Sequence, residues 1–288
     1  MKKFQKVYIE ITNICNLRCD FCPLENRPKE SMCPEDFEYV AKQVCNYTDL
    51  ITLHVKGEPL IHPCLKEILD ICEKYNLMVN ITTNGTLFED TLEILLNSKA
   101  VRQINVSLHS ITQNINNDTY NVNTYLDNVL KYTKMILDKT NIIISYRLWN
   151  LEKLEQNEEN KEILSKIEDF YSIDNLYDRA KKESYVKLAE RAFLNQDIEF
   201  TWPNINGKVI SEEGKCWGLR NQIAILVDGT VVPCCLDQDG IINLGNVFDE
   251  KLDDILNSEL ATKIVKGFEN RKLEHELCKR CGFRTKFD

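Results

Sequence analysis

The chain has 288 residues, 43% hydrophobic and 28% charged, a composition typical of a globular protein that buries a sizeable core. Its formal net charge of −9 argues against a nucleic-acid partner, because no basic excess is present to neutralise phosphates. The basic residues at the N-terminus lead directly into a strand pattern, without the apolar segment of a signal peptide. No apolar run approaches the roughly 18 residues of a membrane span. We therefore expect a cytoplasmic protein without a membrane partner.

The first half of the chain alternates strand and helix patterns. Strand patterns cover residues 7–12, 50–56, 77–83, 102–109 and 142–149, and the first helix begins at Pro34, the favoured N1 position. Further helical patterns lie at 163–170 and 188–193, and a weaker sixth strand at 198–202. Repeated β–α units predict a parallel sheet with right-handed crossovers. We expect an α/β fold, a partial (β/α)6-type TIM barrel, over residues 1–205.

The strand patterns carry polar side chains on one common face. Side chains alternate across a strand, so every second residue faces the same way. A barrel interior is normally filled by branched apolar residues, whereas a polar interior indicates an enclosed ligand and water. The polar set is Tyr8, Glu10, Thr12, Thr52, His54, Lys56, Asn80, Thr82, Asn84, Asn105, Ser107, His109, Ser145 and Arg147.

The chain changes character near residue 206. A glycine-punctuated stretch is followed by a hairpin pattern over residues 223–232, with Asp228-Gly229 as its turn. Five of the chain's cysteines lie in this part. We expect a small second domain over residues 206–288.

Three cysteines form the most specific motif. Cys15, Cys19 and Cys22 are spaced C-x3-C-x2-C directly after the first strand pattern. Disulfides are disfavoured for twelve cysteines without a secretory signal. Three thiolates can hold three corners of a cubane iron–sulfur cluster and leave the fourth iron open. An open metal position is typical of a catalytic site.

Four further motifs follow the next strand patterns. They are Lys56-Gly57-Glu58-Pro59, Thr82-Thr83-Asn84-Gly85, Ser107-Leu108-His109-Ser110 and Arg147-Leu148-Trp149-Asn150. The carboxyl ends of parallel strands meet at one edge, where ligands bind. We therefore expect all of them beside the cysteine triad.

This ordered set resembles the radical S-adenosylmethionine (SAM) enzymes over nearly the whole chain. The resemblance implies that Cys15, Cys19 and Cys22 hold a 4Fe–4S cluster whose open iron binds SAM, and that reductive cleavage yields a 5′-deoxyadenosyl radical. It places Phe21 beside adenine and the backbone of Gly57, Glu58 and Pro59 at the methionine amino group. Asn84, Ser107 and Arg147 are then polar contacts to ribose and carboxylate, for which a guanidinium is suited.

The tail cysteines resemble the auxiliary-cluster region of the SPASM/Twitch subgroup. Cys216, Cys234, Cys278 and Cys281 would fill all four corners of a second 4Fe–4S cluster, which leaves no iron open and implies electron transfer. The shortened Twitch form matches better, because the further cysteines of the full SPASM pattern are not found downstream. A structural zinc site is the alternative, but it is disfavoured because the tail contains only one C-x2-C knuckle.

Three more residues are candidates for catalysis. Cys235, left over beside a cluster ligand, is either a hydrogen-atom donor, as in peptide epimerases, or a packing residue. His109 and Glu10 are placed to bind substrate or move a proton, or else are satisfied interior groups.

The function expected first is hydrogen abstraction from a small polar substrate with net oxidation, as in a Twitch enzyme that oxidises an aminocyclitol. Modification of a ribosomal peptide, by thioether formation or epimerisation, is the alternative. Only six residues precede the first strand pattern, which disfavours a leader-peptide domain. A non-catalytic iron–sulfur or zinc protein is a third possibility. We expect a flavodoxin or ferredoxin as reductant, and the sequence does not identify the substrate.

Overall fold

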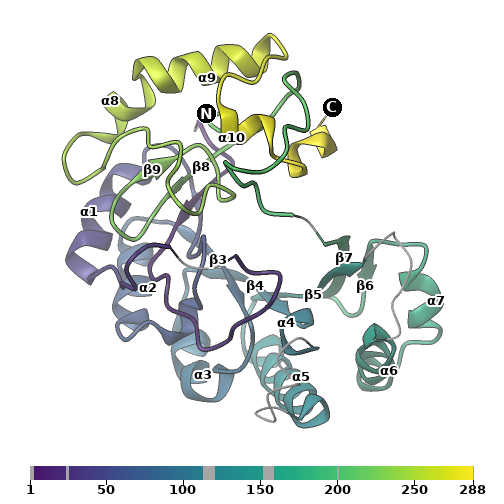
Figure 1. Ribbon diagram of the computed structural model, residues 1–288. Coiled ribbons are helices and arrows are strands. Elements are labelled where there is room, and N and C mark those ends of the chain that lie inside the picture. The colour runs from purple at the N-terminus through teal and green to yellow at the C-terminus, as the bar shows by residue number, and fades with distance from the viewer. Residues whose placement is uncertain (1–2, 24–25, 113–120, 152–158, 200, 288) are drawn as a thin grey trace. The chain divides into compact units, whose positions relative to one another are not determined.

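A computed structural model describes residues 3–23, 26–112, 121–151, 159–199 and 201–287 (Figure 1). The chain divides into two compact units, each of which is described by itself. The first unit contains Met1–Ile14, Pro23–Val79 and Phe200–Asp288, and the second contains Cys15–Cys22 and Asn80–Glu199. The first unit therefore joins the N-terminal strands to the C-terminal quarter of the chain.

The first unit is built on a short, mostly parallel set of strands. Its strand order is β2-β1-β8-β9, with β1 parallel to both β2 and β8, and β8 antiparallel to β9. The strands are β1 (Lys6–Ile9), β2 (Leu50–Thr52), β8 (Gln222–Ile225) and β9 (Val231–Val232). The predicted hairpin is confirmed, and Gly229 in its turn has φ +85°, a conformation that glycine adopts without strain.

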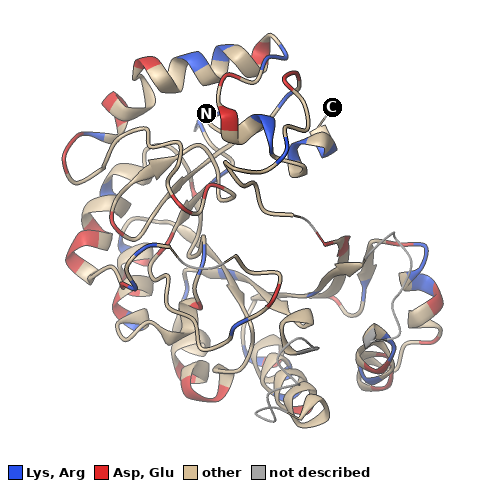
Figure 2. Ribbon diagram, viewed as in Figure 1, with Lys and Arg blue, Asp and Glu red and all other residues tan. Residues whose placement is uncertain are grey.

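Helices complete the first unit. They are α1 (Pro34–Val44), η1 (Pro59–Ile61), α2 (Leu65–Lys74), α8 (Leu252–Leu256), α9 (Glu259–Glu269), α10 (Glu276–Lys279) and η3 (Phe283–Phe287). α1 begins at Pro34 as predicted and buries Phe37, Val40, Ala41 and Val44. The C-terminal segment is fastened to the end of α1, because Leu252 N donates to Gln43 Oε1 at 2.8 Å. Figure 2 shows acidic and basic residues along α1 and α9.

The second unit has the strand order β6-β7-β5-β4-β3. β4, β5 and β7 are parallel neighbours, and β6 is antiparallel to β7. The strands are β3 (Met78–Thr83, of which the first two residues belong to the first unit), β4 (Val101–Ser107), β5 (Ile143–Leu151), β6 (Tyr185–Lys187) and β7 (Ala192–Ile198). The helices are α3 (Phe88–Asn97), α4 (His109–Thr112), α5 (Val122–Lys139), α6 (Glu159–Tyr171) and α7 (Leu176–Ala180).

Side-chain parity follows the prediction. Val7, Ile9, Ile51, Ile81 and Ile104 are fully buried among the apolar residues of their units. On the polar face Asn105 Nδ2 donates to Ile81 O at 3.2 Å and to Thr82 Oγ1 at 3.3 Å. The expected α/β class with mostly parallel strands is thus confirmed.

Two expectations near residue 190 are wrong. The pattern of Leu188, Ala189 and Phe193 is not helical, since β6 and β7 occupy this region. The sixth parallel strand is β7, which ends at Ile198 instead of beginning there. Every second residue of β7 is buried, namely Ala192, Leu194 and Gln196. Because Gln196 is polar, the sequence does not show this alternation as a hydrophobic pattern. The helical pattern predicted at 163–170 is confirmed as part of α6, which begins at Glu159, and residues 152–158 lie outside the described residues.

Candidate functional site: two cysteine clusters

The cysteine loop, Cys15–Cys22, belongs to the second unit. The Asn84 amide, which follows β3, donates to Asn16 Oδ1 at 2.9 Å and lies 4.0 Å from Cys15 Sγ. Cys19 Sγ donates to Ser110 O at 3.7 Å, just beyond β4. The structure therefore brings two of the predicted strand-end motifs to the loop. The donor set, three thiols within eight residues, fits an iron–sulfur cluster with one open iron.

The other strand-end residues of this unit also converge. The rings of Phe21 and His109 lie 4.9 Å apart between centroids. Ser107 and Arg147 are paired across β4 and β5, and the Arg147 guanidinium lies 4.5 Å from the centroid of Trp149. Arginine side chains stack on aromatic faces and also bind carboxylates through paired hydrogen bonds.

His109 is buried, with Nδ1 3.2 Å from Arg147 O and 3.4 Å from Trp149 N. Burial, more than the charge of Arg147, lowers the pKa of His109 to about 4. The imidazole is therefore neutral near pH 7 and is a weak proton acceptor. The surroundings of His109 favour a packing or hydrogen-bonding role over proton transfer. Its role in binding or catalysis remains a prediction.

The Gly57-Glu58-Pro59 segment lies against the residues that precede the cysteine loop. Glu58 N donates to Ile14 O at 2.8 Å, and the Glu58 carboxylate accepts from Leu60 N at 3.1 Å, which caps η1. Gly57 has φ +76°, and a Cβ there would lie 2.3 Å from Thr12 O. Only glycine fits at so close an approach of these two backbone segments.

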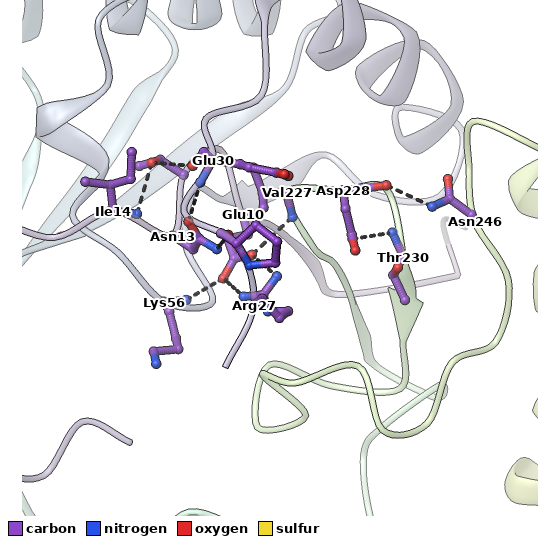
Figure 3. Close-up of polar contacts among 12 residues, drawn as sticks. Glu10, Asn13, Ile14, Arg27, Glu30, Lys56, Val227, Asp228, Thr230 and Asn246 are labelled. Atoms are coloured by element: carbon purple, nitrogen blue, oxygen red, sulfur yellow. Dashed lines mark hydrogen bonds and ion pairs between the residues drawn. The ribbon is translucent and has the colours of Figure 1, made fainter. Parts of the chain in front are cut away.

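Glu10, directly after β1, joins three segments of the first unit (Figure 3). Its carboxylate is fully buried and forms a two-point ion pair with Arg27, with both N–O distances 2.8 Å. The same oxygens accept from Lys56 N at 3.0 Å and Val227 N at 3.1 Å. With both oxygens engaged in this way, the geometry favours a structural role for Glu10 over proton transfer.

The chain on either side of the cysteine loop is fastened in the same region. Asn13 Nδ2 donates to Pro28 O at 2.7 Å, and Asn13 Oδ1 accepts from Glu30 N at 2.8 Å (Figure 3). Lys56 Nζ donates to Pro23 O at 2.6 Å. The first unit thus fixes where the chain enters and leaves the loop.

The second cysteine cluster lies entirely within the first unit. Cys216, Cys234, Cys278 and Cys281 line one cavity, together with Asp237, Arg284 and apolar residues such as Leu236, Ile242 and Phe268. Burial raises the pKa of all four thiols, and neighbouring thiols add to this for Cys216, Cys234 and Cys278. Bound iron reverses that tendency, because a coordinated thiol is deprotonated.

The segments Cys19–Cys22 and Cys278–Cys281 each form the same kind of backbone turn. Cys22 N donates to Cys19 O at 3.1 Å, and Cys281 N donates to Cys278 O at 3.3 Å. Within the described part of the chain, no three His, Cys, Asp or Glu side chains are grouped around one position for a single metal ion. The fit of the tail to an iron–sulfur cluster rests on its donor set, four thiols on one cavity, as a four-cysteine cluster requires.

Cys235 is not among the residues that line this cavity, although it interacts electrostatically with Cys234 and Cys281. It is partly buried against a cluster formed by Tyr8, Val55, Ala224, Leu226 and Val232. Burial raises the pKa of its thiol, against the smaller effect of a hydrogen bond with Tyr8. This environment is compatible with packing and with hydrogen-atom donation.

Sequence reasoning missed two arginines, Arg27 and Arg284. Arg27 is the ion-pair partner of Glu10, and Arg284 is 2% exposed on the four-cysteine cavity. Lys and Arg are seldom fully buried, so a lone arginine in sequence carries no signal of such a position.

Family comparisons agree with both cysteine sets. Residues 9–158 match the radical SAM superfamily, and residues 216–282 match SPASM, an iron–sulfur cluster-binding domain. The chain is similar to the antilisterial bacteriocin subtilosin biosynthesis protein AlbA of Bacillus subtilis (strain 168). The two are 25% identical over 294 residues, which cover 95% of this chain and 64% of AlbA. The chain thus spans less than two thirds of that relative.

Solved structures show the same fold. BtrN in complex with AdoMet and 2-DOIA has a TM-score of 0.61 at 18% identity, over 98% of this chain and 94% of BtrN. Streptococcus suis SuiB bound to the precursor peptide SuiA has a TM-score of 0.61 at 20% identity, over 97% of this chain and 70% of SuiB. In the described residues, no helix is both long and apolar enough to span a membrane.

Glu10→Gln tests the structural role of this carboxylate. Breaking a buried ion pair leaves an uncompensated charge, so the free energy of unfolding should fall by about 3 kcal/mol or more. Asp70→Asn is the control, because the Lys66–Asp70 pair is exposed and exposed ion pairs contribute little to stability. Urea unfolding followed by circular dichroism measures both. Unchanged stability with lost activity would instead support proton transfer by Glu10.

Gly57→Ala tests the close backbone approach between Gly57 and Thr12. The added methyl group collides with Thr12 O, so the segment must move and SAM binding should weaken at least about tenfold, roughly 1.4 kcal/mol. Gly282→Ala is the control, because its Cβ would meet only Ile210 Cδ1 at 3.5 Å. Anaerobic equilibrium dialysis with SAM measures the dissociation constants. Equal values for wild type and Gly57→Ala would contradict the assignment.

Proposed function

Since the chain belongs to the radical SAM superfamily, we propose that it removes a hydrogen atom from an unactivated C–H bond of a peptide. The reaction is a net two-electron oxidation, in which the substrate loses a hydrogen atom, an electron and a proton. Both the bond attacked and the substrate are part of the proposal.

The cofactors follow from the two domains. The radical SAM domain binds a 4Fe–4S cluster and SAM, and the SPASM domain indicates auxiliary iron–sulfur binding. When bound, these groups supply a 5′-deoxyadenosyl radical and an acceptor for one electron. Formation of the radical requires a low-potential electron donor, for which we propose a flavodoxin or a ferredoxin.

The contrast between the two cysteine sets carries the proposal. Cys15, Cys19 and Cys22 offer three thiols, whereas Cys216, Cys234, Cys278 and Cys281 share one cavity as a set of four. Three thiols leave one iron of a cubane for SAM, and four leave none. This division supports radical formation at the loop and electron acceptance at the tail.

The side chains around the loop are assigned to SAM in this proposal. Phe21 contacts the adenine, the backbone of Gly57, Glu58 and Pro59 receives the amino group, and Asn84, Ser107 and Arg147 bind ribose and carboxylate. The contacts of Asn84 with the loop and of Arg147 with Trp149 support these positions.

A peptide substrate is favoured by the relative that covers most of the chain. AlbA acts in the biosynthesis of a bacteriocin, and its similarity extends over 95% of this chain. The small polar substrate expected first from the sequence remains the second candidate. The resemblance to BtrN spans both chains almost completely, but at 18% identity it concerns the fold alone.

Epimerisation is a second reaction to consider. Cys235 packs against Tyr8 and its neighbours, apart from the cavity of the other four tail cysteines. In this second reaction, Cys235 is the candidate that would return a hydrogen atom to a substrate radical.

The test uses anaerobically reconstituted protein with SAM, a chemical reductant and either deuterated peptides or deuterated aminocyclitols. A peptide oxidase should transfer deuterium from the peptide to 5′-deoxyadenosine and yield a peptide that has lost two hydrogen atoms. Transfer from the aminocyclitol alone would favour the second candidate. Uptake of solvent hydrogen without loss of mass, abolished in Cys235→Ala, would indicate epimerisation.

Variants of the tail separate its role from that of the loop. Cys278→Ala with Cys281→Ala should still produce 5′-deoxyadenosine but no oxidised peptide, because the electron acceptor is lost. Cys45→Ala is the matched control, since Cys45 is the C-cap of α1 and belongs to neither cysteine set. Full oxidation of the peptide by the double variant would contradict the proposed role of the tail cysteines. Absence of SAM cleavage by the wild-type protein would contradict the proposal that it is an active radical SAM enzyme.

A further inference from the structure

Arg284 places a buried positive charge on the wall of the four-cysteine cavity. The residue lies in η3, three residues after Cys281. Its side chain is among the largest fully buried ones in the described residues, with 2% exposure. It lines the same cavity as Cys216, Cys234, Cys278 and Cys281.

A guanidinium in such a place needs negative charge nearby. It stays protonated at any physiological pH, and transfer of a charge from water into the protein interior is costly unless an opposite charge compensates it. An iron–sulfur cluster held by four thiolates carries net negative charge. Its assembly in this cavity gives the burial of Arg284 a physical reason.

The field of Arg284 reaches three of the four thiols. The guanidinium interacts electrostatically with Cys216, Cys278 and Cys281, which line the same cavity. The backbone of Phe283 and Arg284 also hydrogen-bonds to the Cys281 thiol. Charge and hydrogen bonds directed at cluster sulfurs are among the factors that set the reduction potential of an iron–sulfur cluster.

The cavity also contains one acidic side chain. Asp237 accepts from Ile241 N at 2.9 Å and from Ile242 N at 2.7 Å, so its carboxylate is directed to the backbone of its own loop. The guanidinium of Arg284, in contrast, can only donate hydrogen bonds, so acceptors and negative charge around it are what stabilise it.

We propose that Arg284 raises the reduction potential of the auxiliary cluster, and so makes that cluster a better acceptor for an electron from the substrate radical. The inference rests on the assignment of the four tail cysteines made above. One-electron reduction adds one negative charge to the cluster, and a positive charge close by in the low-dielectric interior stabilises that reduced state. Arg284 acts through the cluster and does not contact the substrate.

The experiment is a redox titration followed by electron paramagnetic resonance. It uses full-length protein in which Cys15, Cys19 and Cys22 are replaced by alanine, so that only the tail cluster contributes. Arg284→Met should shift the midpoint potential to more negative values, since the side chain keeps its bulk but loses its charge. Arg284→Lys should remain close to the parent protein. Lys286→Met, an exposed change in the same helix, should have little effect.

Two outcomes would overturn the inference. One is an unchanged potential in Arg284→Met with full iron content, and the other is an equal shift in Lys286→Met. If Arg284→Met does not retain the cluster, Arg284→Lys decides, because a parent-like potential supports the role of charge and a shifted one contradicts it. Iron and sulfide analysis of the parent distinguishes these results from failure of the cluster assignment, in which no tail cluster is found.

Discussion

The first unit depends on the burial of one carboxylate, that of Glu10. A charged group without access to water must find all of its partners within the protein. Glu10 finds them in Arg27, the backbone of Lys56 and the backbone of Val227. Arg27 lies in the segment that follows the cysteine loop, Lys56 in the segment after β2, and Val227 in the turn after β8. Segments distant in sequence therefore hold one another in place around a single charge.

The two cysteine sets are supported differently. The loop from Cys15 to Cys22 lies on the polar ends of β3 and β4, with Asn84 and Ser110 as neighbours. The tail cysteines are instead largely buried, and they line a cavity with apolar residues, one arginine and one aspartate. A site that must admit SAM and substrate needs polar contacts and access, whereas an electron acceptor needs enclosure and a tuned charge. The surroundings of each set agree with the role proposed for it.

Local signals predicted much of this architecture. Pro34 predicted the start of α1, Asp228-Gly229 the hairpin, and the alternation in β1 to β4 the buried face, because each depends on residues close in sequence. β7 was missed because Gln196 is buried in a strand whose neighbours are polar. Arg27 and Arg284 could not be recognised, since their burial arises only when distant segments close around them. The helices α8 and α9 were not predicted from the sequence either.

The spacing of the loop cysteines indicated a cluster but not the way in which it is held. Glu10, which the sequence placed among the catalytic candidates, is engaged by three partners in the structure, and His109 is kept neutral by burial. Polar residues on an interior face are thus a poor guide to individual roles. The contacts of each side chain decide between catalysis and support.

The central claim is that the chain holds two iron–sulfur clusters with different ligation. Mössbauer spectroscopy of protein reconstituted with isotopically enriched iron, recorded with and without SAM, tests it directly. SAM should change the signal of one iron in one cluster, and this change should be absent when Cys15, Cys19 and Cys22 are replaced. The second cluster should not respond to SAM. A single cluster, or two clusters that both respond, would contradict the account.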